Sequence, residues 1–424
     1  MKQKQSIQDT QDAIDAIKKK LLGKKLKYSE VFSIMDDISH ERLSPVLTTY
    51  FAAAGFTEGF STEELYFMTK AMVETGQRLY FPGIVADKHS TGGVAGTRTT
   101  MILVPIVAAA GFTIPKNSSR AITAPAGTAD TMEVLAPVTF TIRQIERIVK
   151  KIGGCIVWGG SIGLAPADDI LIQVEKPLAF ESYDKFIVSI MAKKIASGAT
   201  HLVLDIPVGP TMKIQHFEDA EIIAKKFRYL GEKFNVRVVT DVNETRENAG
   251  HGVGPVLEAK DVLQVLEQHP DRPLALEAKA LRLAGKLLSI CLDDSKKHHG
   301  AIRGEDLARD MLLSGKALSK MREIIKAQGG DPDVESKKLK PGKFVFEWKT
   351  NHPGRVTKID NQQVSIISKI LGCPTDKRSG MYLNRKLEEK VDAHDILCTL
   401  YSSDSWRLKE AVETLKHEPV YTLE

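Results

Sequence analysis

A chain of 424 residues, 42% of them hydrophobic and 27% charged, has the composition of a globular protein and enough length for two or three domains. Its net charge of +5 is modest, and no basic stretch with interleaved aromatic residues points to nucleic acid. The four cysteines are widely spaced without a Cys-x-x-Cys pair, which argues against a disulfide framework or a zinc site and favours reduced thiols in the cytoplasm. No apolar run is long enough to span a membrane.

The first part of the chain predicts helices. Apolar residues recur at helical spacing between residues 14 and 22. Further on, Ser61 and Glu64 have the spacing of a capping box in front of an apolar run. We therefore expect a helical subdomain over residues 1–78.

A glycine-rich stretch follows an apolar run that ends at Ala86. It reads Asp-Lys-His-Ser-Thr-Gly-Gly-Val-Ala-Gly-Thr-Arg-Thr-Thr over residues 87–100 and leads into an apolar helical run. A strand, a glycine-rich loop and a helix in this order predict an anion site, to which Lys88 adds a full charge. It is not a nucleotide P-loop, because Gly-Lys-Ser/Thr is absent. The alternative is a tight turn whose glycines serve packing alone.

A second loop of the same kind follows a short strand predicted at 113–116. Residues 117–133 carry hydroxyl groups and a glycine into the start of another helix. Two such loops after consecutive strands would open at the same edge of a parallel sheet, where α/β proteins bind ligands. A strand predicted at 153–158 would end in a third loop at that edge.

The rest of the chain predicts strands and helices in alternation, and then a change of character. Helices are expected over 164–196, 220–234, 259–267 and 274–330, and strands over 201–207 and 236–241. Repeats of this kind form parallel sheets whose strands are joined by right-handed crossovers. Beyond residue 340 the pattern predicts short strands at 344–348, 354–359 and 364–367 and a helix at 405–416.

The two glycine-containing loops at 87–100 and 117–133 resemble those of the pyrimidine-nucleoside phosphorylase family, which includes thymidine phosphorylase. The run Lys-His-Ser-Thr-Gly-Gly at residues 88–93 is that family's signature. The run Ser-Ser-Arg-Ala-Ile-Thr-Ala-Pro-Ala-Gly-Thr-Ala-Asp at residues 118–130 is similar to one branch, that of AMP phosphorylase and bacterial relatives labelled thymidine phosphorylase. Further matches lie at 159–168 and 191–194, so the resemblance covers nearly the whole chain.

The resemblance implies an α/β fold with three parts. A mainly helical subdomain and an α/β domain with a mixed or parallel sheet would flank an active-site cleft, and a C-terminal α+β domain would follow. The expected boundaries are 1–78 and 164–198 for the helical subdomain, 79–163 and 199–335 for the α/β domain, and 336–424 for the C-terminal domain. Family members assemble as homodimers or larger homo-oligomers, so we expect self-association and no nucleic-acid or membrane partner.

The activity implied is phosphorolysis of the N-glycosidic bond of a nucleoside or nucleoside 5′-monophosphate. Inorganic phosphate would attack the sugar, and a free base and a sugar 1-phosphate (or 1,5-bisphosphate) would result. This chemistry relies on positioning and electrostatics, so no metal or organic cofactor is expected. Thymidine phosphorylase is the alternative to AMP phosphorylase. An anthranilate-type phosphoribosyltransferase and a non-catalytic nucleotide-binding scaffold are more remote alternatives.

The resemblance also implies site residues. Those that match phosphate-binding positions are Lys88, Ser90, Thr100, Ser118 and Thr128. Those that match nucleoside- or nucleotide-binding positions are Gly93, Ser119, Arg120, Ala121, Ile122, Thr123, Ala124, Ser189 and Lys193. Ser189 and Lys193 are four residues apart and therefore share one helix face. His89 is expected to hydrogen-bond the base or sugar or to transfer a proton near neutral pH, the alternative being a structural histidine.

Three further positions bear on the substrate. Glu175 stands where thymidine phosphorylases have an arginine against the pyrimidine carbonyl, and a carboxylate there disfavours thymine. Lys213 occupies a position at which AMP phosphorylases bind nucleotide. Glu181 aligns with the aspartate proposed as the proton donor to the purine in that branch, where a carboxyl group with a raised pKa would suit the task. Nearby Asp184 is an alternative donor.

Other charged residues are given structural interpretations. Asp130 and Glu133 are expected to favour a helix N-terminus. His298 and His299 look like a metal pair, but adjacent residues do not face together on a helix and the flanking lysines repel cations. We expect them at the surface.

Overall fold

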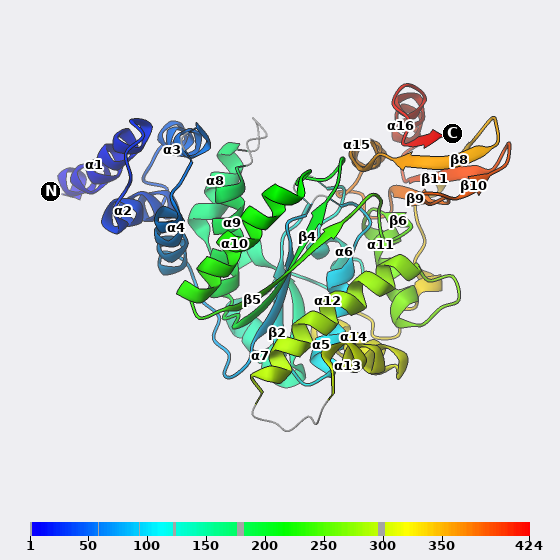
Figure 1. The fold of residues 1–424 in the computed structure, drawn as a ribbon, viewed down its shortest axis with the longest axis horizontal. Coiled ribbons are helices and arrows are strands. Elements are labelled where there is room, and N and C mark those ends of the chain that lie inside the picture. Colours follow the sequence, from blue (N-terminus) through cyan, green and yellow to red (C-terminus); the bar gives the residue numbers. More distant parts are fainter. Residues whose placement is uncertain (1, 58, 93, 122–123, 176–181, 296–301) are drawn as a thin grey trace. The chain divides into compact units, whose positions relative to one another are not determined.

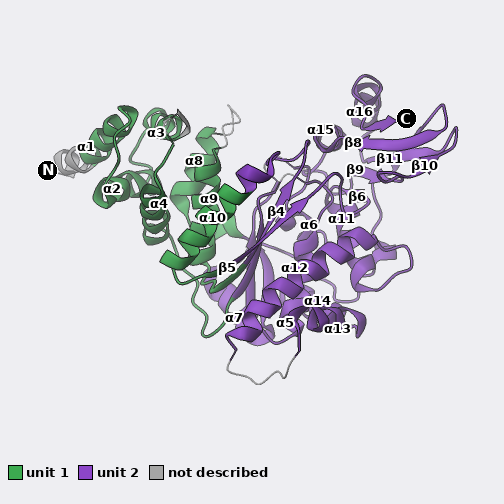
Figure 2. Ribbon diagram, in the orientation of Figure 1, with its two compact units in different colours: residues 1–85, 159–202, 221–238 green, residues 86–158, 203–220, 239–424 purple. Residues whose placement is uncertain are grey.

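The computed structural model describes residues 2–57, 59–92, 94–121, 124–175, 182–295 and 302–424. The chain forms two compact units, which are coloured separately in Figure 2. The helical unit comprises residues 1–85, 159–202 and 221–238, and the α/β unit comprises residues 86–158, 203–220 and 239–424. None of the helices in the described ranges is long and apolar enough to cross a membrane.

The helical unit gathers helices from separate stretches of the chain (Figure 1). They are α1 (Lys2–Leu21), α2 (Tyr28–Ser39), α3 (Pro45–Thr57), α4 (Thr62–Glu74), the 3₁₀ turn η1 (Gly159–Ser161), α8 (Pro166–Glu175), α9 (Tyr183–Ala196) and most of α10 (Phe217–Lys233). The predicted capping box is confirmed at the start of α4. The Ser61 hydroxyl accepts the N–H of Glu64 at 3.3 Å, and the Glu64 carboxylate accepts the N–H of Ser61 at 2.8 Å.

A buried ion pair joins α1 to α4. The Lys20 ammonium lies 3.0 Å from the carboxylate of Glu64, and their side chains are only 4% and 2% exposed. The same carboxylate accepts the N–H of Leu26 at 3.1 Å. Burial alone would raise the pKa of Glu64, but these backbone N–H groups and Lys20 hold it below its ordinary value. The Glu64 carboxylate is therefore ionised, and it accepts hydrogen bonds from the Lys20 ammonium and from two backbone N–H groups.

The α/β unit is built on short strands. One sheet has the order β1-β4-β5, formed by β1 (Ala86–Ser90), β4 (His201–Val208) and β5 (Arg237–Glu244). A second pairs β2 (Ile114–Ser118) with β3 (Gly154–Trp158) in parallel. β1 lies beside β2, because the N–H of Ala86 donates to the carbonyl of Thr113 at 2.8 Å. The parallel α/β architecture predicted from the sequence is confirmed.

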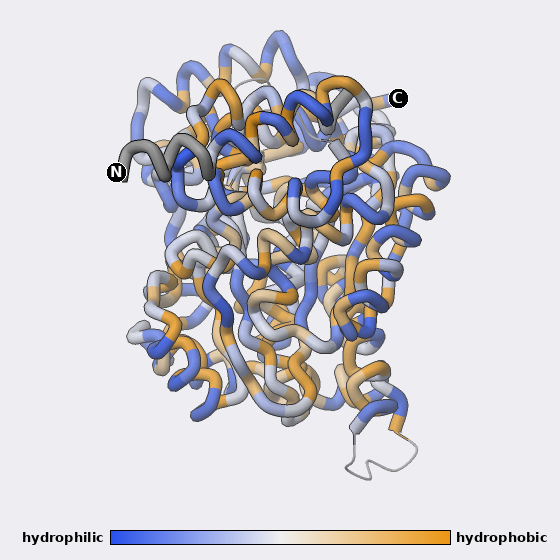
Figure 3. The backbone as a smooth tube through the Cα atoms, turned by 90° about the vertical axis from the view of Figure 1, so that its left-hand side faces the viewer, coloured by the Kyte–Doolittle hydropathy of each residue, from blue (hydrophilic) through white to orange (hydrophobic). Residues whose placement is uncertain are grey.

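Helices cover these strands. They are α5 (Thr99–Ala109), α6 (Thr128–Met132), α7 (Ile142–Ile152), α11 (Pro255–Leu266), α12 (Leu274–Asp293), α13 (Gly304–Leu313) and α14 (Lys316–Ala327), with a 3₁₀ turn η3 (Ser336–Lys338). Hydrophilic and hydrophobic stretches alternate along many helices in Figure 3. α5 differs, since its residues from Thr99 to Ala108 are buried on every side. A helix that is apolar all round belongs in a core. The first loop therefore leads directly into a helix in the core of the unit.

The C-terminal part of the α/β unit is antiparallel. β6 (Gly252–Val253), β9 (Gly380–Leu383), β11 (Ile396–Ser402) and β7 (Phe344–Lys349) form a four-stranded sheet in that order. β10 (Lys390–Val391), β8 (Gly354–Ile359) and β12 (Tyr421–Leu423) form a three-stranded one. With α15 (Asn361–Leu371) and α16 (Ser405–His417) they enclose a hydrophobic core of their own.

One predicted strand, at 364–367, is wrong, because these residues lie inside helix α15. Asp360 caps this helix, and its carboxylate accepts two backbone N–H groups of the first turn at 2.9 and 3.2 Å. Val364 and Ile367, three residues apart, are both fully buried on one face. A run of branched residues is typical of a strand, but the cap and the burial of this face favour the helix.

The Lys20–Glu64 pair gives a stability prediction. The variant Lys20→Met leaves a buried carboxylate without its cation, and we expect it to lower the free energy of unfolding by about 3–5 kcal/mol. The double variant Lys20→Met, Glu64→Gln should recover most of this loss, because glutamine still completes the capping box. Urea unfolding followed by far-ultraviolet circular dichroism measures both.

The matched control is Lys18→Met. Lys18 pairs with Asp15 at 3.0 Å, but the two side chains are 63% and 60% exposed, so we expect a change within about 0.5 kcal/mol. Equal losses for Lys18→Met and Lys20→Met would contradict the importance of burial.

Candidate functional site

β1 reaches further than the sequence predicts, and it carries Lys88 and Ser90 on the strand itself. The predicted strand ends at Ala86, whereas β1 runs to Ser90. Its charged residues are balanced by a neighbour. The Lys116 ammonium of β2 lies 3.1 Å from the Asp87 carboxylate and donates to the carbonyl of Lys88 at 2.7 Å. This pairing lets a polar sequence form a buried strand.

Lys88 is a buried cation that points to the start of α5. Lys88 is only 3% exposed, and its ammonium donates to the hydroxyl of Thr99 at 3.1 Å. Burial lowers the pKa of Lys88 to about 8, although the carboxylate of Asp205 opposes this change. Lys88 thus places a positive charge beside a helix N-terminus, which itself attracts anions.

Asp205 organises the ends of β1 and β4. Its carboxylate accepts the Ser90 hydroxyl at 2.9 Å and the side-chain amide of Asn243 at 2.9 Å, and it lies 3.2 Å from the Lys279 ammonium. Burial alone would raise the pKa of Asp205, but Lys279 and Lys88 hold it below its ordinary value. No local sequence pattern identifies Asp205, since its partners are more than 35 residues away along the chain.

The second loop lies against the first. Arg98, which precedes α5, donates to the carbonyl of Ala126 at 2.9 Å and to the hydroxyl of Thr128 at 3.3 Å. Thr128 is the first residue of α6, and Ser118 is the last residue of β2. The two loops therefore meet, as the order of strands and loops in the sequence predicts.

Buried polar groups at these strand ends lack partners among the described residues. They are the hydroxyl oxygen of Thr91, just after β1, and the amide nitrogen of Asn117, on β2. Thr100 is also buried, in the first turn of α5. A buried polar group without a hydrogen bond costs about 1–3 kcal/mol. A bound polar ligand at the ends of β1 and β2 would satisfy such groups.

The C-terminal part of the unit supports the first loop. The side-chain oxygen of Asn361, at the start of α15, accepts the N–H of Ala95 at 3.0 Å. The amide of Asn248 donates to the carbonyl of Ala95 at 2.8 Å and to Asn361 at 3.1 Å. Both polar groups of the Ala95 backbone are thus held by buried asparagines, which no motif in the sequence identifies.

Arg120 is bound by carboxylates in this structure. Its guanidinium donates to Glu133 at 2.7 and 2.8 Å and to Asp130 at 3.1 Å, and it lies 4.8 Å from the centre of the Trp158 ring. Lys377 also pairs with Glu133. Arg120 and Lys377 together lower the pKa of Glu133 to about 2. The side-chain contacts of Asp130 and Glu133 therefore orient Arg120. Asp130 also accepts the N–H of Gly127 at the start of α6, as predicted, whereas Glu133 follows the end of α6, so its predicted place at a helix N-terminus is wrong.

In the helical unit, Ser189 and Lys193 share one carboxylate. Asp168 accepts the Ser189 hydroxyl at 2.7 Å and lies 2.7 Å from the Lys193 ammonium. Asp169 lies 3.1 Å from the same ammonium. Burial alone would lower the pKa of Lys193, but these two carboxylates raise it, so the ammonium is charged. Both residues lie on α9, as the spacing of four predicts, and the α8 carboxylates fix their orientation.

Glu175 and Asp184 also have partners within the helical unit. Glu175 lies 2.6 Å from the Lys185 ammonium, with both side chains nearly buried. Asp184 accepts the N–H of Phe60 at 3.2 Å and pairs with Lys226 of α10. These contacts tie Asp184 to the packing of the unit and disfavour it as a proton donor.

The remaining predicted residues are placed as follows. His89 is half-buried on β1, Lys213 is half-buried between β4 and α10, Ser119 is exposed, and Ala121 and Ala124 are half-buried on the second loop. Gly93, Ile122, Thr123, Glu181, His298 and His299 lie outside the described residues. In the part of the chain that is described, no group of three or more His, Cys, Asp or Glu side chains could hold a metal ion.

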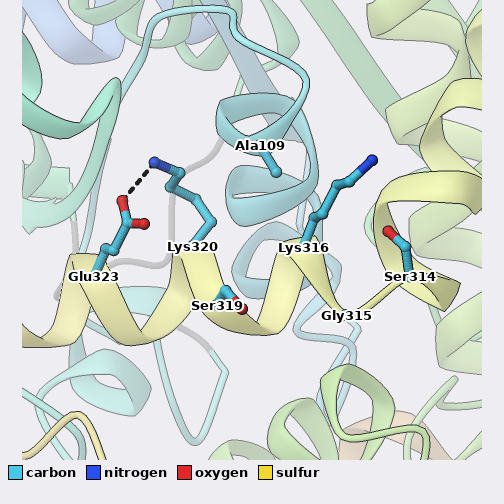
Figure 4. A pocket seen from close by; sticks show the side chains of 7 residues that line it. All are labelled: Ala109, Ser314, Gly315, Lys316, Ser319, Lys320 and Glu323. Carbon is cyan, nitrogen blue, oxygen red and sulfur yellow. Dashed lines mark hydrogen bonds and ion pairs between the residues drawn. The ribbon is translucent and has the colours of Figure 1, made fainter.

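A surface hollow at the start of α14 carries lysines but none of the predicted site residues. Figure 4 shows its lining, which consists of Ala109, Ser314, Gly315, Lys316, Ser319, Lys320 and Glu323. Lys320 pairs with Glu323 at 2.5 Å, and Lys316 pairs with Asp310 at 3.4 Å. Because both lysine charges are balanced, the strand ends of β1 and β2 are the better anion site.

Family comparisons match three parts of the chain. Residues 14–76 match the "Glycosyl transferase family, helical bundle domain", and residues 83–318 match the "Glycosyl transferase family, a/b domain". Residues 355–422 match the "Pyrimidine nucleoside phosphorylase C-terminal domain". The resemblance drawn from the loop motifs is confirmed.

Individual relatives agree with these matches. The chain is 44% identical to the AMP phosphorylase of Thermofilum pendens, over 95% of this chain and 76% of that protein. It is 42% identical to a Methylococcus capsulatus protein named "Putative thymidine phosphorylase", over 92% and 74% respectively. The anthranilate phosphoribosyltransferase of Thermus thermophilus shares the fold, with a TM-score of 0.58 and 19% identity over 74% of this chain and 99% of that one.

The lowered pKa of Lys88 gives a pH prediction. Lysine loses its charge as the pH rises, so binding of inorganic phosphate should weaken above pH 8, the pKa of Lys88 being about 8. We expect the loss to approach about tenfold per pH unit. The variant Lys88→Met should bind phosphate about 10- to 100-fold more weakly below that pH. Equilibrium dialysis with labelled phosphate measures each dissociation constant.

Two variants control for other effects of the substitution. Lys88→Arg keeps its charge at every accessible pH and should lose the alkaline weakening. Lys316→Met removes an exposed lysine of the α14 hollow and should leave the dissociation constant for phosphate and its pH dependence unchanged. Unaltered phosphate binding by Lys88→Met would remove Lys88 from the site.

Proposed function

We propose that this chain is a phosphorylase acting on nucleoside 5′-monophosphates. It belongs to the glycosyltransferase family whose helical-bundle and α/β domains match it. One observation carries the proposal. The Lys88 ammonium and hydroxyls of both loops gather where β1 ends and α5 and α6 begin. The chain around them is 44% identical to an AMP phosphorylase.

The α/β unit would hold the attacking phosphate. Lys88 supplies the charge, and Ser90, Thr100, Ser118 and Thr128 supply hydroxyl donors at the strand ends and helix starts. A phosphate oxygen forms a bond to the anomeric carbon while the carbon–nitrogen bond to the base breaks. The electrons of that bond pass to the base, so the transition state gains positive charge on the sugar beside the phosphate.

The helical unit would bind the base. Ser189 and Lys193 offer one hydroxyl and one ammonium group, both oriented by Asp168. The leaving nitrogen base needs a proton, for which we propose Glu181 from its place in the sequence. Lys193 is charged and can stabilise electron density on the departing ring.

Substrate choice is assigned to two other positions. Lys213 would bind the 5′-phosphate as a cation. Glu175 would disfavour a carbonyl-bearing pyrimidine, although its ion pair with Lys185 limits its freedom to bind an exocyclic amine.

Thymidine phosphorylase is the second candidate. A relative that is 42% identical over 92% of this chain carries that name with the word "Putative". A 2′-deoxynucleoside without a 5′-phosphate would make no use of Lys213. The two candidates therefore differ in the effect of Lys213 on binding.

We also propose the setting of the reaction. Inorganic phosphate is a co-substrate and no metal or organic cofactor takes part. The four cysteines are free and buried, which suits a cytoplasmic enzyme. Self-association as a homo-oligomer is proposed from the family alone.

The first test is base release by the purified protein in phosphate buffer. AMP, CMP, UMP, adenosine, cytidine, uridine and thymidine would be compared by chromatography. We expect a monophosphate to be cleaved at least about tenfold faster than its nucleoside, a difference of about 1.4 kcal/mol in transition-state binding. Activity should be unchanged in EDTA, whereas a phosphoribosyltransferase would require magnesium.

The variant that tests the proposed 5′-phosphate contact is Lys213→Met. It should raise the KM for the monophosphate and leave that for the nucleoside unchanged, because only the former presents a 5′-phosphate. Preference for thymidine or uridine would favour thymidine phosphorylase. Release from none of the seven would overturn the proposed function.

A further inference from the structure

An ion pair between the first predicted phosphate loop and helix α11 has no role in the function as proposed so far. Arg98 precedes α5, and its Nε–H pairs with Glu258 of α11. The Arg98 side chain is 11% exposed and that of Glu258 is completely buried. A buried pair is tolerated only where its other hydrogen-bonding groups are satisfied, so the remaining contacts of both residues are informative.

Glu258 gathers groups from several segments. One carboxylate oxygen accepts the N–H of Gly96 in the first loop at 3.3 Å and the N–H of Gly254 at 3.2 Å. The other accepts the hydroxyl of Thr131, on α6, at 3.3 Å. Burial raises the pKa of Glu258, and Arg98 opposes this. The contacts to Gly96, Gly254 and Thr131 fix the carboxyl group in place, and Arg98 is bound to it.

Arg98 in turn holds the second loop. One terminal nitrogen donates to the carbonyl of Ala126 at 2.9 Å, and the other donates to the hydroxyl of Thr128 at 3.3 Å. A guanidinium group only donates hydrogen bonds. The Thr128 oxygen must therefore accept from Arg98, which leaves its own O–H to donate to another group. That is the polarity needed by a phosphate oxygen.

We infer that Arg98, oriented by Glu258, is a positioning residue for phosphate: it fixes Thr128 at the start of α6 with the hydroxyl hydrogen available to the bound anion. The inference rests on the proposed function, because it takes Thr128 as a phosphate ligand. Lysine at position 98 would keep the charge, but its three N–H donors share one nitrogen. They could not reach the three partners that separate nitrogens of the planar guanidinium serve in Arg98.

The test uses single and double variants of the full chain. Arg98→Met removes the pair, Arg98→Lys keeps its charge, and Thr128→Val removes the hydroxyl with little change in shape. Arg98→Met, Glu258→Gln removes both charges and keeps the fold testable if Arg98→Met alone is unstable. Each is measured for phosphate binding by equilibrium dialysis, for KM and kcat with AMP and phosphate, and for melting temperature.

Phosphate affinity should respond and nucleotide affinity should not. We expect Arg98→Met to weaken phosphate binding about 10- to 100-fold, with the KM for AMP changed less than about threefold. Arg98→Lys should be intermediate. Adding Arg98→Met to Thr128→Val should cost little more than Thr128→Val alone, because both act through one hydroxyl. The double variant Arg98→Met, Glu258→Gln should melt near the wild type and still bind phosphate weakly.

The control is Arg272→Met. Arg272 pairs with Glu277 at 2.5 Å in the same unit, with side chains 22% and 14% exposed, and its loss should leave phosphate binding unchanged. Wild-type phosphate affinity in Arg98→Met, Glu258→Gln would overturn the inference, because Arg98 would then only neutralise Glu258. Multiplying effects of Arg98→Met and Thr128→Val would also overturn it.

These outcomes are separable from failure of the proposed function. A wild-type protein that binds phosphate by dialysis but releases no base contradicts the proposed reaction, and the binding measurements still decide the role of Arg98. A wild-type protein that binds no phosphate contradicts the inference. A protein that releases base normally while Arg98→Met keeps full phosphate affinity contradicts the inference alone.

Discussion

The candidate site depends on the burial of a cation. Lys88 lies in the middle of β1 with 3% exposure, and an ammonium group taken out of water is costly unless a counter-charge lies nearby. Asp205 provides that charge, and it is itself held by Lys279. The result is a positive group whose charge is only partly compensated. A weaker counter-charge from Asp205 would make burial of the ammonium more costly. A stronger counter-charge would leave the ammonium less able to attract phosphate.

The same arrangement recurs around other side chains of the proposed site. Asp168 orients Ser189 and Lys193 in the helical unit, and Glu258 orients Arg98 in the α/β unit. In each case a buried carboxylate holds a hydroxyl or a cation in one direction. Such preorganisation suits a reaction in which charge develops on sugar and base, because the groups need not reorient as the bond breaks.

Much of this protein could be predicted from its sequence. Local patterns predicted the capping box at Ser61, both glycine-containing loops and the position of Ser189 and Lys193 on one helix face. Local patterns were wrong at 364–367, where branched residues favour a strand but the Asp360 cap and a buried face favour a helix. They also ended β1 too early, because a charged strand is stable only with Lys116 beside it.

The sequence by itself determined the alternation of strands and helices in the α/β unit up to β5, the family and the residue types proposed to bind phosphate and base, since these follow from local spacing and motifs. Only the tertiary structure decided which carboxylate serves each of them. Asp205 lies 115 residues from Ser90, and Glu258 lies 160 residues from Arg98. No local pattern links such partners, because burial and packing bring them together and make a charge in one segment require its counter-charge in another.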